Sequence, residues 1–269
     1  MISDFAKAIN NSYVDIKKAC LRINLVRILG SQEIKQRYRR SKLGPFWITI
    51  SMGVTIAIIS VIFSQALDNA IENFVPHVAI GIVTWSFISS TINEGATSFI
   101  SSSNMIRQLA LPLSVYPMKI LWKNFIVLLH NVWIIPIVFL LIGRPFAITC
   151  LLCIPAFFLL SLNLFVISLM LGTVCARYRD LLPIVSSVLQ VLFYVTPIIW
   201  TENALNARAS LFVMQINPFY HFLEIIRKPL MGTLPPADSW IICLIITSGL
   251  LMFGLLFFGL FKKRVAYWV

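Results

Sequence analysis

The chain has 269 residues, of which 59% are hydrophobic and 12% charged, and its mean hydropathy is +0.88. These values lie outside the range of soluble domains, so the composition indicates an integral membrane protein whose solvent is the bilayer. The net charge of +12 is compatible with nucleic acid, an acidic substrate or an anionic lipid surface, and the positions of the charges must decide among them.

Residues 1–42 are predicted to form a cytoplasmic amphipathic helix followed by a basic loop. Ile16, Ala19, Cys20 and Ile23 recur at roughly helical spacing among lysines and arginines, which suits a helix lying in the membrane interface. A cytosolic helix packed on another subunit fits the same pattern, and both descriptions can hold. The segment has no continuous apolar core, so it is not a secretory signal and we expect the mature chain to keep it.

Six membrane-spanning helices are predicted, giving an all-α integral membrane fold. About 20 apolar residues at 1.5 Å per residue cross the ~30 Å hydrocarbon core, and six uncharged runs approach or exceed this length. The predicted spans, within a transmembrane domain of residues 43–261, are residues 45–67, 75–97, 118–142, 147–174, 181–200 and 239–261. The fourth run is longer than one crossing requires, so Pro145 and Phe146 are assigned to the preceding turn.

Lysine and arginine are distributed unequally between the two faces of this topology. Eighteen of the 22 fall on one face, and the other face holds only Arg144, Arg208, Arg227 and Lys228. Because cytoplasmic loops are enriched in Lys and Arg, the basic face is assigned to the cytoplasm, with both termini and a tail at residues 262–269. Each base near anionic headgroups contributes about 1 kcal/mol, so nucleic-acid binding becomes an unnecessary hypothesis.

The connection at residues 201–238 is predicted to be periplasmic and to contain short re-entrant helices. Its uncharged run at residues 209–223 is too short to span the membrane. Asn217 and Pro218 interrupt any continuous helix, because proline lacks a backbone donor and disfavours helical geometry in the preceding residue. Backbone of this kind at membrane depth must be buried in protein or line a water-filled path.

Motifs for catalysis, nucleotide binding or metal binding are missing from the sequence. No G-x-x-x-x-G-K-[ST] motif occurs, so an energising nucleotide would be bound by another polypeptide, and neither a cofactor nor a metal is predicted for this chain. Cys150 and Cys153 form a C-x-x-C in an apolar segment, which indicates a buried helix face because thiolates and metals need polar partners. His130 and Asn131 are interpreted as hydrogen-bonding groups between helices, in preference to a proton relay.

Two basic patches lie at predicted membrane boundaries. The first precedes a Leu-Gly-Pro break and two aromatic residues, and consists of Arg37, Arg39, Arg40 and Lys42. Anchoring in the membrane interface explains this pattern, and four cations at the inner mouth would also form a site for phosphate or pyrophosphate. The second, Arg177 and Arg179, either closes a hairpin with Asp180 or contacts a headgroup or a cytoplasmic partner.

An aromatic patch ends the fifth predicted span. Tyr194 and Trp200 are either aromatic residues of the membrane interface or platforms on which sugar rings stack. Pro197 is predicted to bend the helix at this point, as a pore-lining element often requires.

Five features occur in order along the chain: R-R-S-K-L-G-P-F-W before the first span, Asn104 followed by Pro112 and Pro117, the A-R-Y-R-D turn, the Y-V-T-P-I-I-W segment and the Asn217-Pro218 loop. On a six-span topology they resemble the permease subunit of ABC-2-type exporters of bacterial O-antigen, teichoic acid and capsule-like polysaccharides. The resemblance implies an inner-membrane homodimer with two copies of a separate ATPase, which binds ATP and Mg. Its substrate would be an undecaprenyl-pyrophosphate-linked polysaccharide, carried from cytoplasm to periplasm.

The resemblance also implies roles for individual residues. Residues 98–108 look like the coupling helix that docks on the ATPase, through Ser101, Ser102, Ser103, Asn104 and Arg107. The lipid and its pyrophosphate would enter beside Arg37, Arg39, Arg40, Lys42, Leu43, Gly44, Arg177 and Arg179. The first and fifth spans would line the channel and contact the glycan through Phe46, Trp47, Phe63, Tyr194 and Trp200.

Three other functions fit parts of the pattern. An ABC-2 exporter of drugs or small lipids would use the same scaffold, and neighbouring genes for glycosyltransferases or for resistance regulators would distinguish the two cargoes. A membrane-embedded acyl or glycosyl transferase would need clustered histidines or carboxylates, and only Glu202 and His221 share a loop. A stand-alone secondary carrier would need intramembrane charge, which the uncharged runs do not supply.

Overall fold

The computed structural model describes residues 2–39, 44, 46–66, 71–201 and 214–269, and these form helices and connections with no strand. Five helical segments among them are long and apolar enough to cross a membrane. They are α3 (Phe46–Ala66), α4 (Ile71–Ala96), α7 with α8 (Val115–Asn131 and Ile134–Ile142), η1 with α9 (Ile148–Leu152 and Cys153–Arg177) and α13 (Ala237–Trp268). The chain is therefore a multi-pass helical membrane protein, as its composition predicts.

The fifth predicted span corresponds to α10 (Leu181–Val195), a shorter apolar helix. Its 15 residues extend about 22 Å, less than the ~30 Å of hydrocarbon. The predicted bend at Pro197 is wrong, because the helix has already ended at Val195. Thr196, immediately before that proline, is extended with ψ of 136°, the geometry that a following proline imposes. The sixth crossing stays a prediction.

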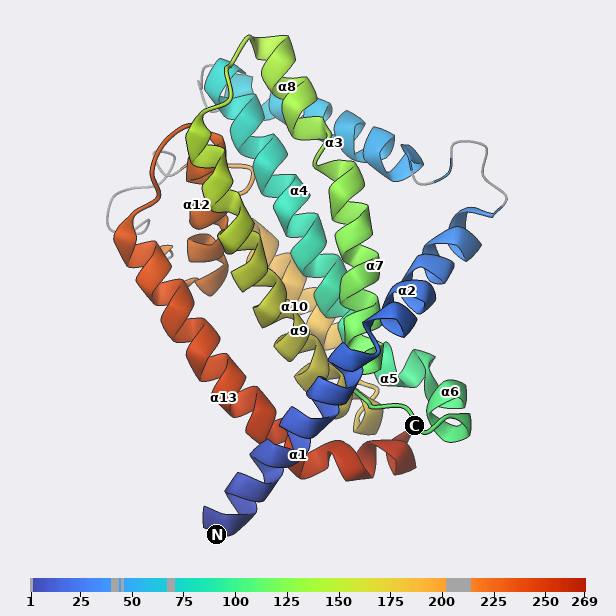
Figure 1. Cartoon of the computed structure of the whole chain (residues 1–269). Coiled ribbons are helices and arrows are strands. Elements are labelled where there is room, and N and C mark those ends of the chain that lie inside the picture. Colours follow the sequence, from blue (N-terminus) through green and yellow to red (C-terminus); the bar gives the residue numbers. More distant parts are fainter. Residues whose placement is uncertain (1, 40–43, 45, 67–70, 202–213) are drawn as a thin grey trace.

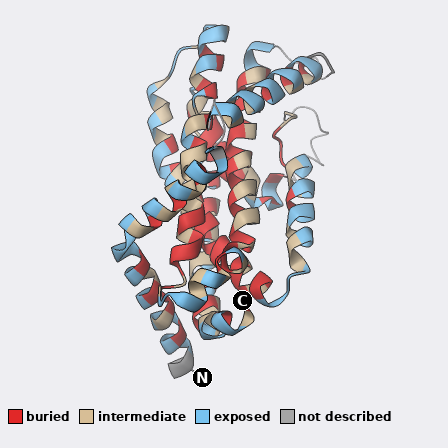
Figure 2. Cartoon of the chain, turned by 90° about the vertical axis from the view of Figure 1, so that its right-hand side faces the viewer, coloured by how far each residue is buried: buried red, intermediate tan, exposed pale blue. Residues whose placement is uncertain are grey.

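Helices α4 and α9 form the centre of the bundle (Figure 1). Around α4 pack α3, α7 and α8, while α9 also contacts α13. Buried residues gather along the middle of the bundle and exposed ones along the outer helices (Figure 2). Small residues let the two central helices approach closely: a Cβ atom added to Gly95 of α4 would lie 3.0 Å from the Cα atom of Ser168 in α9.

The predicted N-terminal helix is divided into α1 (Ile2–Leu21) and α2 (Ile23–Tyr38), which join at Arg22. α1 packs on α13 and α2 packs on α7. Asp15 is buried on the inner face of α1, where its Oδ2 accepts hydrogen bonds from the backbone N–H and the hydroxyl of Ser114 at 2.9 and 2.7 Å. Exposed apolar side chains remain on the outer face of α1, so an interfacial position stays compatible with the structure.

Both termini lie at the same end of the bundle, called here the termini end, and the opposite end is called the far end (Figure 1). α13 continues as helix through the predicted tail at residues 262–269 as far as Trp268. Helix α12 (Pro218–Leu230) begins directly after Asn217, whose side chain accepts a hydrogen bond from the N–H of Phe219 at 3.0 Å. The helix break at Asn217 and Pro218 is thus confirmed, whereas re-entry of this segment into the membrane stays a prediction.

Candidate functional site

Four charged residues from three helices form a carboxylate–lysine cluster, defined as Glu33 of α2, Glu94 of α4, and Lys119 and Lys123 of α7. The Nζ atom of Lys119 lies 2.6 Å from Oε1 of Glu33. The Nζ atom of Lys123 lies 3.2 Å from Oε2 of Glu33 and 2.9 Å from Oε2 of Glu94. Asn124 completes the cluster by donating its Nδ2–H to Oε2 of Glu94 at 2.7 Å. Alternating charges thereby connect α2 to α4 through α7.

The two lysines of the cluster are largely withdrawn from water, whereas Glu33 and Glu94 are partly exposed, so the lysines need these carboxylates as partners. Lys119 is 6% exposed, and lysine is rarely buried to this extent without a partner. Burial raises the pKa of the Glu33 carboxyl, but the hydrogen bonds and charges of Lys119 and Lys123 together outweigh it, so this pKa lies below its ordinary value. The stabilisation is therefore complete above the ordinary carboxyl pKa and is lost as the pH falls through the lowered one.

The carboxylate–lysine cluster is not among the sites predicted from the sequence. Glu33 and Glu94 stand far apart in the sequence; Glu33 resembles an ordinary charge of the basic N-terminal segment, and Glu94 resembles one that ends an uncharged run. The one available signal is the spacing of Lys119 and Lys123, because residues four apart lie on the same face of a helix. That spacing indicates a shared acidic partner but does not identify it.

The predicted coupling segment, residues 98–108, forms two short helices, α5 (Ser98–Ser101) and α6 (Ser103–Gln108). Ser102, at the junction of the two helices, is 5% exposed. The Nζ atom of Lys119 donates a hydrogen bond to its hydroxyl oxygen at 3.4 Å. One lysine therefore contacts the coupling segment and Glu33 of α2 at the same time.

The other predicted docking residues lie nearer the surface. Ser101, Asn104 and Arg107 are exposed and Ser103 is partly exposed. The guanidinium of Arg107 donates hydrogen bonds from both Nε and Nη2 to the carbonyl oxygen of Val269, and the Nε distance is 3.0 Å. The coupling segment is thus held against the end of α13 on one side and presents polar side chains on the other.

The described part of the first basic patch lies at the end of α2, which runs along α7 away from the termini end (Figure 1). Arg37 is well exposed, and its Nη2 atom lies 3.8 Å from Oε1 of Glu94. Arg39 is exposed. Gly44 has φ of 56°, a left-handed conformation that favours glycine. Three further predicted residues lie outside the described part of the chain, namely Arg40, Lys42 and Leu43.

The second basic patch contacts a different element. The guanidinium of Arg177 lies 5.1 Å from the ring centre of Tyr178 and 5.4 Å from that of Trp268 in α13. Arg179 is exposed. Arg37 therefore contacts the carboxyl end of α4, whereas Arg177 stacks against the end of α13.

The beginning of α3 contacts the junction of α7 and α8. The ring of Phe46 lies 5.8 Å from the ring of His130. The hydroxyl of Thr49 donates to Oδ1 of Asn131 at 3.1 Å, so the predicted hydrogen bond between helices is confirmed for Asn131. The same prediction is wrong for His130. Its Nδ1 bonds the carbonyl oxygen of Ile126, one turn earlier in the same helix, at 2.8 Å.

The predicted channel-lining aromatic residues are mostly at the surface of the subunit. Trp47 and Tyr194 are more than half exposed, while Phe63 and Trp200 are partly exposed. The indole Nε1 of Trp200 donates to the carbonyl oxygen of Tyr194 at 3.0 Å, which fixes the chain after α10. The two rings therefore come from one short segment, as predicted, and that of Tyr194 is accessible.

Helices α3 and α10 leave most of their apolar surface uncovered. Of the 15 residues in α10, only Leu189 is buried. α3 packs on α4 and on part of α7, and its exposed side includes Val54, Ile58 and Val61. Such surfaces face lipid or another membrane chain.

Comparison with known proteins places this chain among transport proteins. The sequence profile of the family described as "ABC-2 type transporter" matches residues 24–231. Two proteins of Klebsiella pneumoniae, both named O-antigen export system permease protein RfbA, are 24% and 25% identical over 247 and 248 residues. Each alignment covers 90% of this chain and 94% of the relative.

A protein of the same name from Myxococcus xanthus is 23% identical over 195 residues, covering 71% of this chain and 74% of that protein. The matched region runs from α2 to the end of α12 and contains the carboxylate–lysine cluster, the coupling segment and four of the five candidate spans. The chain is a membrane-spanning member of the ABC-2 type transporter family.

Proposed function

We propose that the chain is the membrane-spanning subunit of an ATP-driven exporter of an undecaprenyl-pyrophosphate-linked polysaccharide of the O-antigen type. It would act in the bacterial inner membrane, with both termini in the cytoplasm. The observation that carries the proposal is the similarity to O-antigen export permeases over 90% of the chain. Cations at the end of α2 and accessible aromatic rings on α3 and α10 fit a substrate with a pyrophosphate and sugars.

The motor in this proposal is a separate ATPase, present in two copies, that binds ATP and Mg. The exposed polar side chains of the coupling segment would receive it. Lys119 supports this role, because it contacts both Ser102 of that segment and Glu33 of α2. A movement imposed on the coupling segment would thus be transmitted to the helix that carries Arg37.

The channel in this proposal forms between two copies of the chain. α3 and α10 support a homodimer, because each has a long apolar surface that no other described part of the chain covers. Pairing these helices across a dimer would place the rings of Trp47 and Tyr194 beside the path of the glycan.

The proposal is tested with the permease and its ATPase purified together and reconstituted in vesicles with lipid-linked polysaccharide. Replacing Arg37 and Arg39 by glutamine should lower export by about tenfold or more, because charge-assisted contacts to phosphate are worth about 1.5–3 kcal/mol each. Replacing the exposed Lys263 and Arg264 by glutamine is the matched control and should leave export unchanged. Equal export by all three proteins would contradict the proposed role of the basic patch.

A second candidate is export of a drug or a small lipid. It is favoured by an apolar groove of about 430 Å³ between α7 and α9, lined by residues that include Phe125, Leu129 and Phe158. Transport of a fluorescent lipid by the purified complex, with no response of ATP hydrolysis to lipid-linked polysaccharide, would favour this candidate over the first.

The proposed orientation predicts opposite labelling of two cysteines. Cys20 is exposed in the last turn of α1, on the side proposed to be cytoplasmic, and Cys150 is partly exposed in η1, which packs on α12 on the side proposed to be periplasmic. In single-cysteine variants, a membrane-impermeant maleimide should label Cys150 in spheroplasts, and should label Cys20 only after the membrane is permeabilised. Cys243 is buried and should react only in denaturant. Labelling of Cys20 in intact spheroplasts would reverse the orientation.

A further inference from the structure

A cleft lies where the end of α1 meets the connection after the coupling segment and the last turns of α13. Its volume is about 550 Å³, and residues 110–112 form one of its walls. Four charged side chains line it, namely Asp15 and Lys18 of α1, Arg22 at the junction of α1 and α2, and Lys262 of α13. All the lining residues and their neighbours in the sequence belong to the described part of the chain. Segments distant in the sequence thus bring these charges together.

The carboxylate of this group is already satisfied within the chain. Oδ1 of Asp15 lies 3.0 Å from the Nζ atom of Lys262, and Oδ2 accepts two hydrogen bonds from Ser114. The Nζ atom of Lys262 also donates to the carbonyl oxygen of Asn11 at 3.0 Å. Asp15 and Lys262 therefore neutralise each other, and their bond fixes α1 against α13 beside the cleft.

Lys18 and Arg22 are the other two cations of the cleft. Both are exposed, and neither forms an ion pair or a side-chain hydrogen bond with any described residue. The two stand four positions apart, a spacing at which like charges on a helix repel each other. An anion placed between them would remove that repulsion. The cleft therefore presents two neighbouring cations that are available to a ligand.

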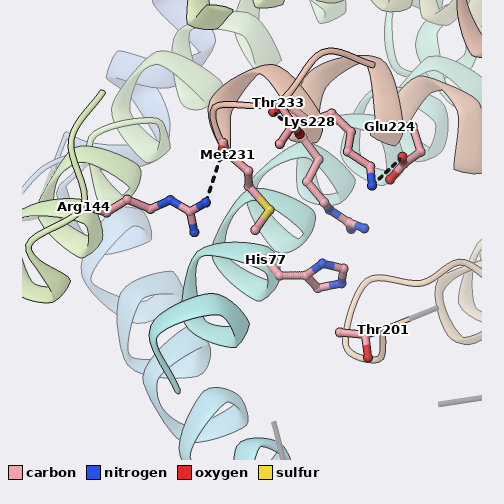
Figure 3. Close-up of a pocket in the computed structure, with 8 residues that line it drawn as sticks. His77, Arg144, Thr201, Glu224, Lys228, Met231 and Thr233 are labelled. Carbon is pink, nitrogen blue, oxygen red and sulfur yellow. Dashed lines mark hydrogen bonds and ion pairs between the residues drawn. The ribbon is translucent and has the colours of Figure 1, made fainter. Parts of the chain in front are cut away.

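The cavity at the far end of the bundle differs from this cleft (Figure 3). Its lining residues include Arg144, Arg227, Lys228 and Glu224. The Nζ atom of Lys228 lies 3.6 Å from Oε2 of Glu224, and the guanidinium groups of Arg144 and Arg227 donate to backbone carbonyl oxygens at 2.8 and 2.7 Å. The cations of that cavity are thus bonded within the chain, whereas Lys18 and Arg22 are not.

The surroundings of these two cations indicate which kind of anion the cleft suits. Val14 and Leu21 line the same cleft, and Leu21 is 78% exposed. Lys262 is the first charged residue after the uncharged stretch at residues 239–261. The cleft therefore lies where the apolar part of α13 ends, which is the depth of lipid headgroups. A ligand that joins a phosphate to apolar chains matches both the charge and the depth.

We propose that this cleft binds the headgroup of an anionic phospholipid. Lys18 and Arg22 would bind the phosphate through charge-assisted hydrogen bonds, and Val14 and Leu21 would contact the glycerol and the first methylene groups. An acidic surface of a partner protein offers the same charge but no apolar chain for these two side chains. The inference depends on the position of the chain in a membrane and not on the proposed cargo.

Binding is measured by native mass spectrometry on the whole chain, purified in detergent and freed of lipid. The probe is dioctanoyl phosphatidylglycerol, and dioctanoyl phosphatidylcholine is the zwitterionic comparison. The first phosphatidylglycerol should bind about tenfold more tightly than the first phosphatidylcholine, because each base near an anionic headgroup adds to the affinity. The double variant with Lys18→Gln and Arg22→Gln should lose this preference while binding phosphatidylcholine as before.

The matched control, Lys7→Gln with Lys17→Gln, removes the same charge from exposed positions of α1 that do not line the cleft, and should keep the preference. A photoreactive residue in place of Leu21 should crosslink phosphatidylglycerol, which tests the site even if melting shows that the double variant is unfolded. Absence of the preference in the unchanged protein, its persistence in the folded double variant, or absence of the crosslink would overturn the proposal. A double variant that keeps the preference but loses its ATPase would identify a protein docking site instead.

Discussion

Replacing Lys119 by methionine should separate ATP hydrolysis from export. Lys119 contacts Ser102 of the coupling segment at 3.4 Å and Glu33 of α2 at 2.6 Å, and methionine keeps its apolar length but neither contact. Export by reconstituted complex should fall about tenfold or more, equivalent to about 1.4 kcal/mol, while basal ATP hydrolysis persists. Leaving Glu33 with one partner fewer should also lower the free energy of unfolding by about 1–3 kcal/mol, measured as a lower melting temperature.

A double variant distinguishes lost stability from lost transmission. Combining Lys119→Met with Glu33→Leu replaces both ions by apolar groups, which often restores stability, and leaves Lys123 paired with Glu94 at 2.9 Å. The melting temperature should recover, but export should stay low because the coupling segment has lost its contact with α2. Lys263→Met, at an exposed position, is the control. Normal export by Lys119→Met would show that this lysine transmits nothing.

Replacing Gly95 by alanine should force apart the two central helices. The new Cβ atom would lie 3.0 Å from the Cα atom of Ser168, and closer still to the side chain of that serine, so α4 or α9 must move. Overpacking of this kind costs about 1–3 kcal/mol. The same displacement would shift Ser98, at the start of the coupling segment, so both the melting temperature and export should fall.

Gly249→Ala in α13 is the matched control, because nothing lies within 4 Å of its added Cβ atom. It should be neutral or stabilising, since alanine is a better helix former than glycine by about 1 kcal/mol. Adding Ser168→Gly to Gly95→Ala should restore part of the loss by removing the side chain that the new methyl group meets. Equal melting temperatures for Gly95→Ala and Gly249→Ala would mean that α4 and α9 do not approach as closely as described.

Some local features could be predicted because they depend on neighbouring residues alone. The break at Asn217 and Pro218 follows from the missing donor of proline and the capping ability of asparagine, and the structure confirms it. The bend predicted at Pro197 did not form. Thr196, the residue before the proline, is extended, and α10 therefore ends at Val195 instead of bending. The rules for proline thus located both interruptions, but whether the helix bends or ends at each of them depended on the packing around it.

The candidate site depended much more on contacts between distant segments. Asn131 was predicted to bond another helix and does, whereas its neighbour His130 bonds within α7. Both residues lie against the beginning of α3, where His130 meets the ring of Phe46 and Asn131 meets the hydroxyl of Thr49, and no local pattern specifies which side chain of α3 faces each of them. Glu33 and Glu94 likewise meet only because α2 and α4 both pack on α7.

The sequence by itself determined that this is a helical membrane protein, because the hydropathy and length of the apolar runs determine which segments can cross the bilayer. It also determined the helix break at Asn217 and Pro218, since that is a property of adjacent residues. The tertiary structure alone decided which charges share a site: Lys119 with Glu33, and Arg144 with Arg227 and Lys228. The physical reason is that a buried charge must find partners in space, and those partners are chosen by helix packing across long separations in the chain.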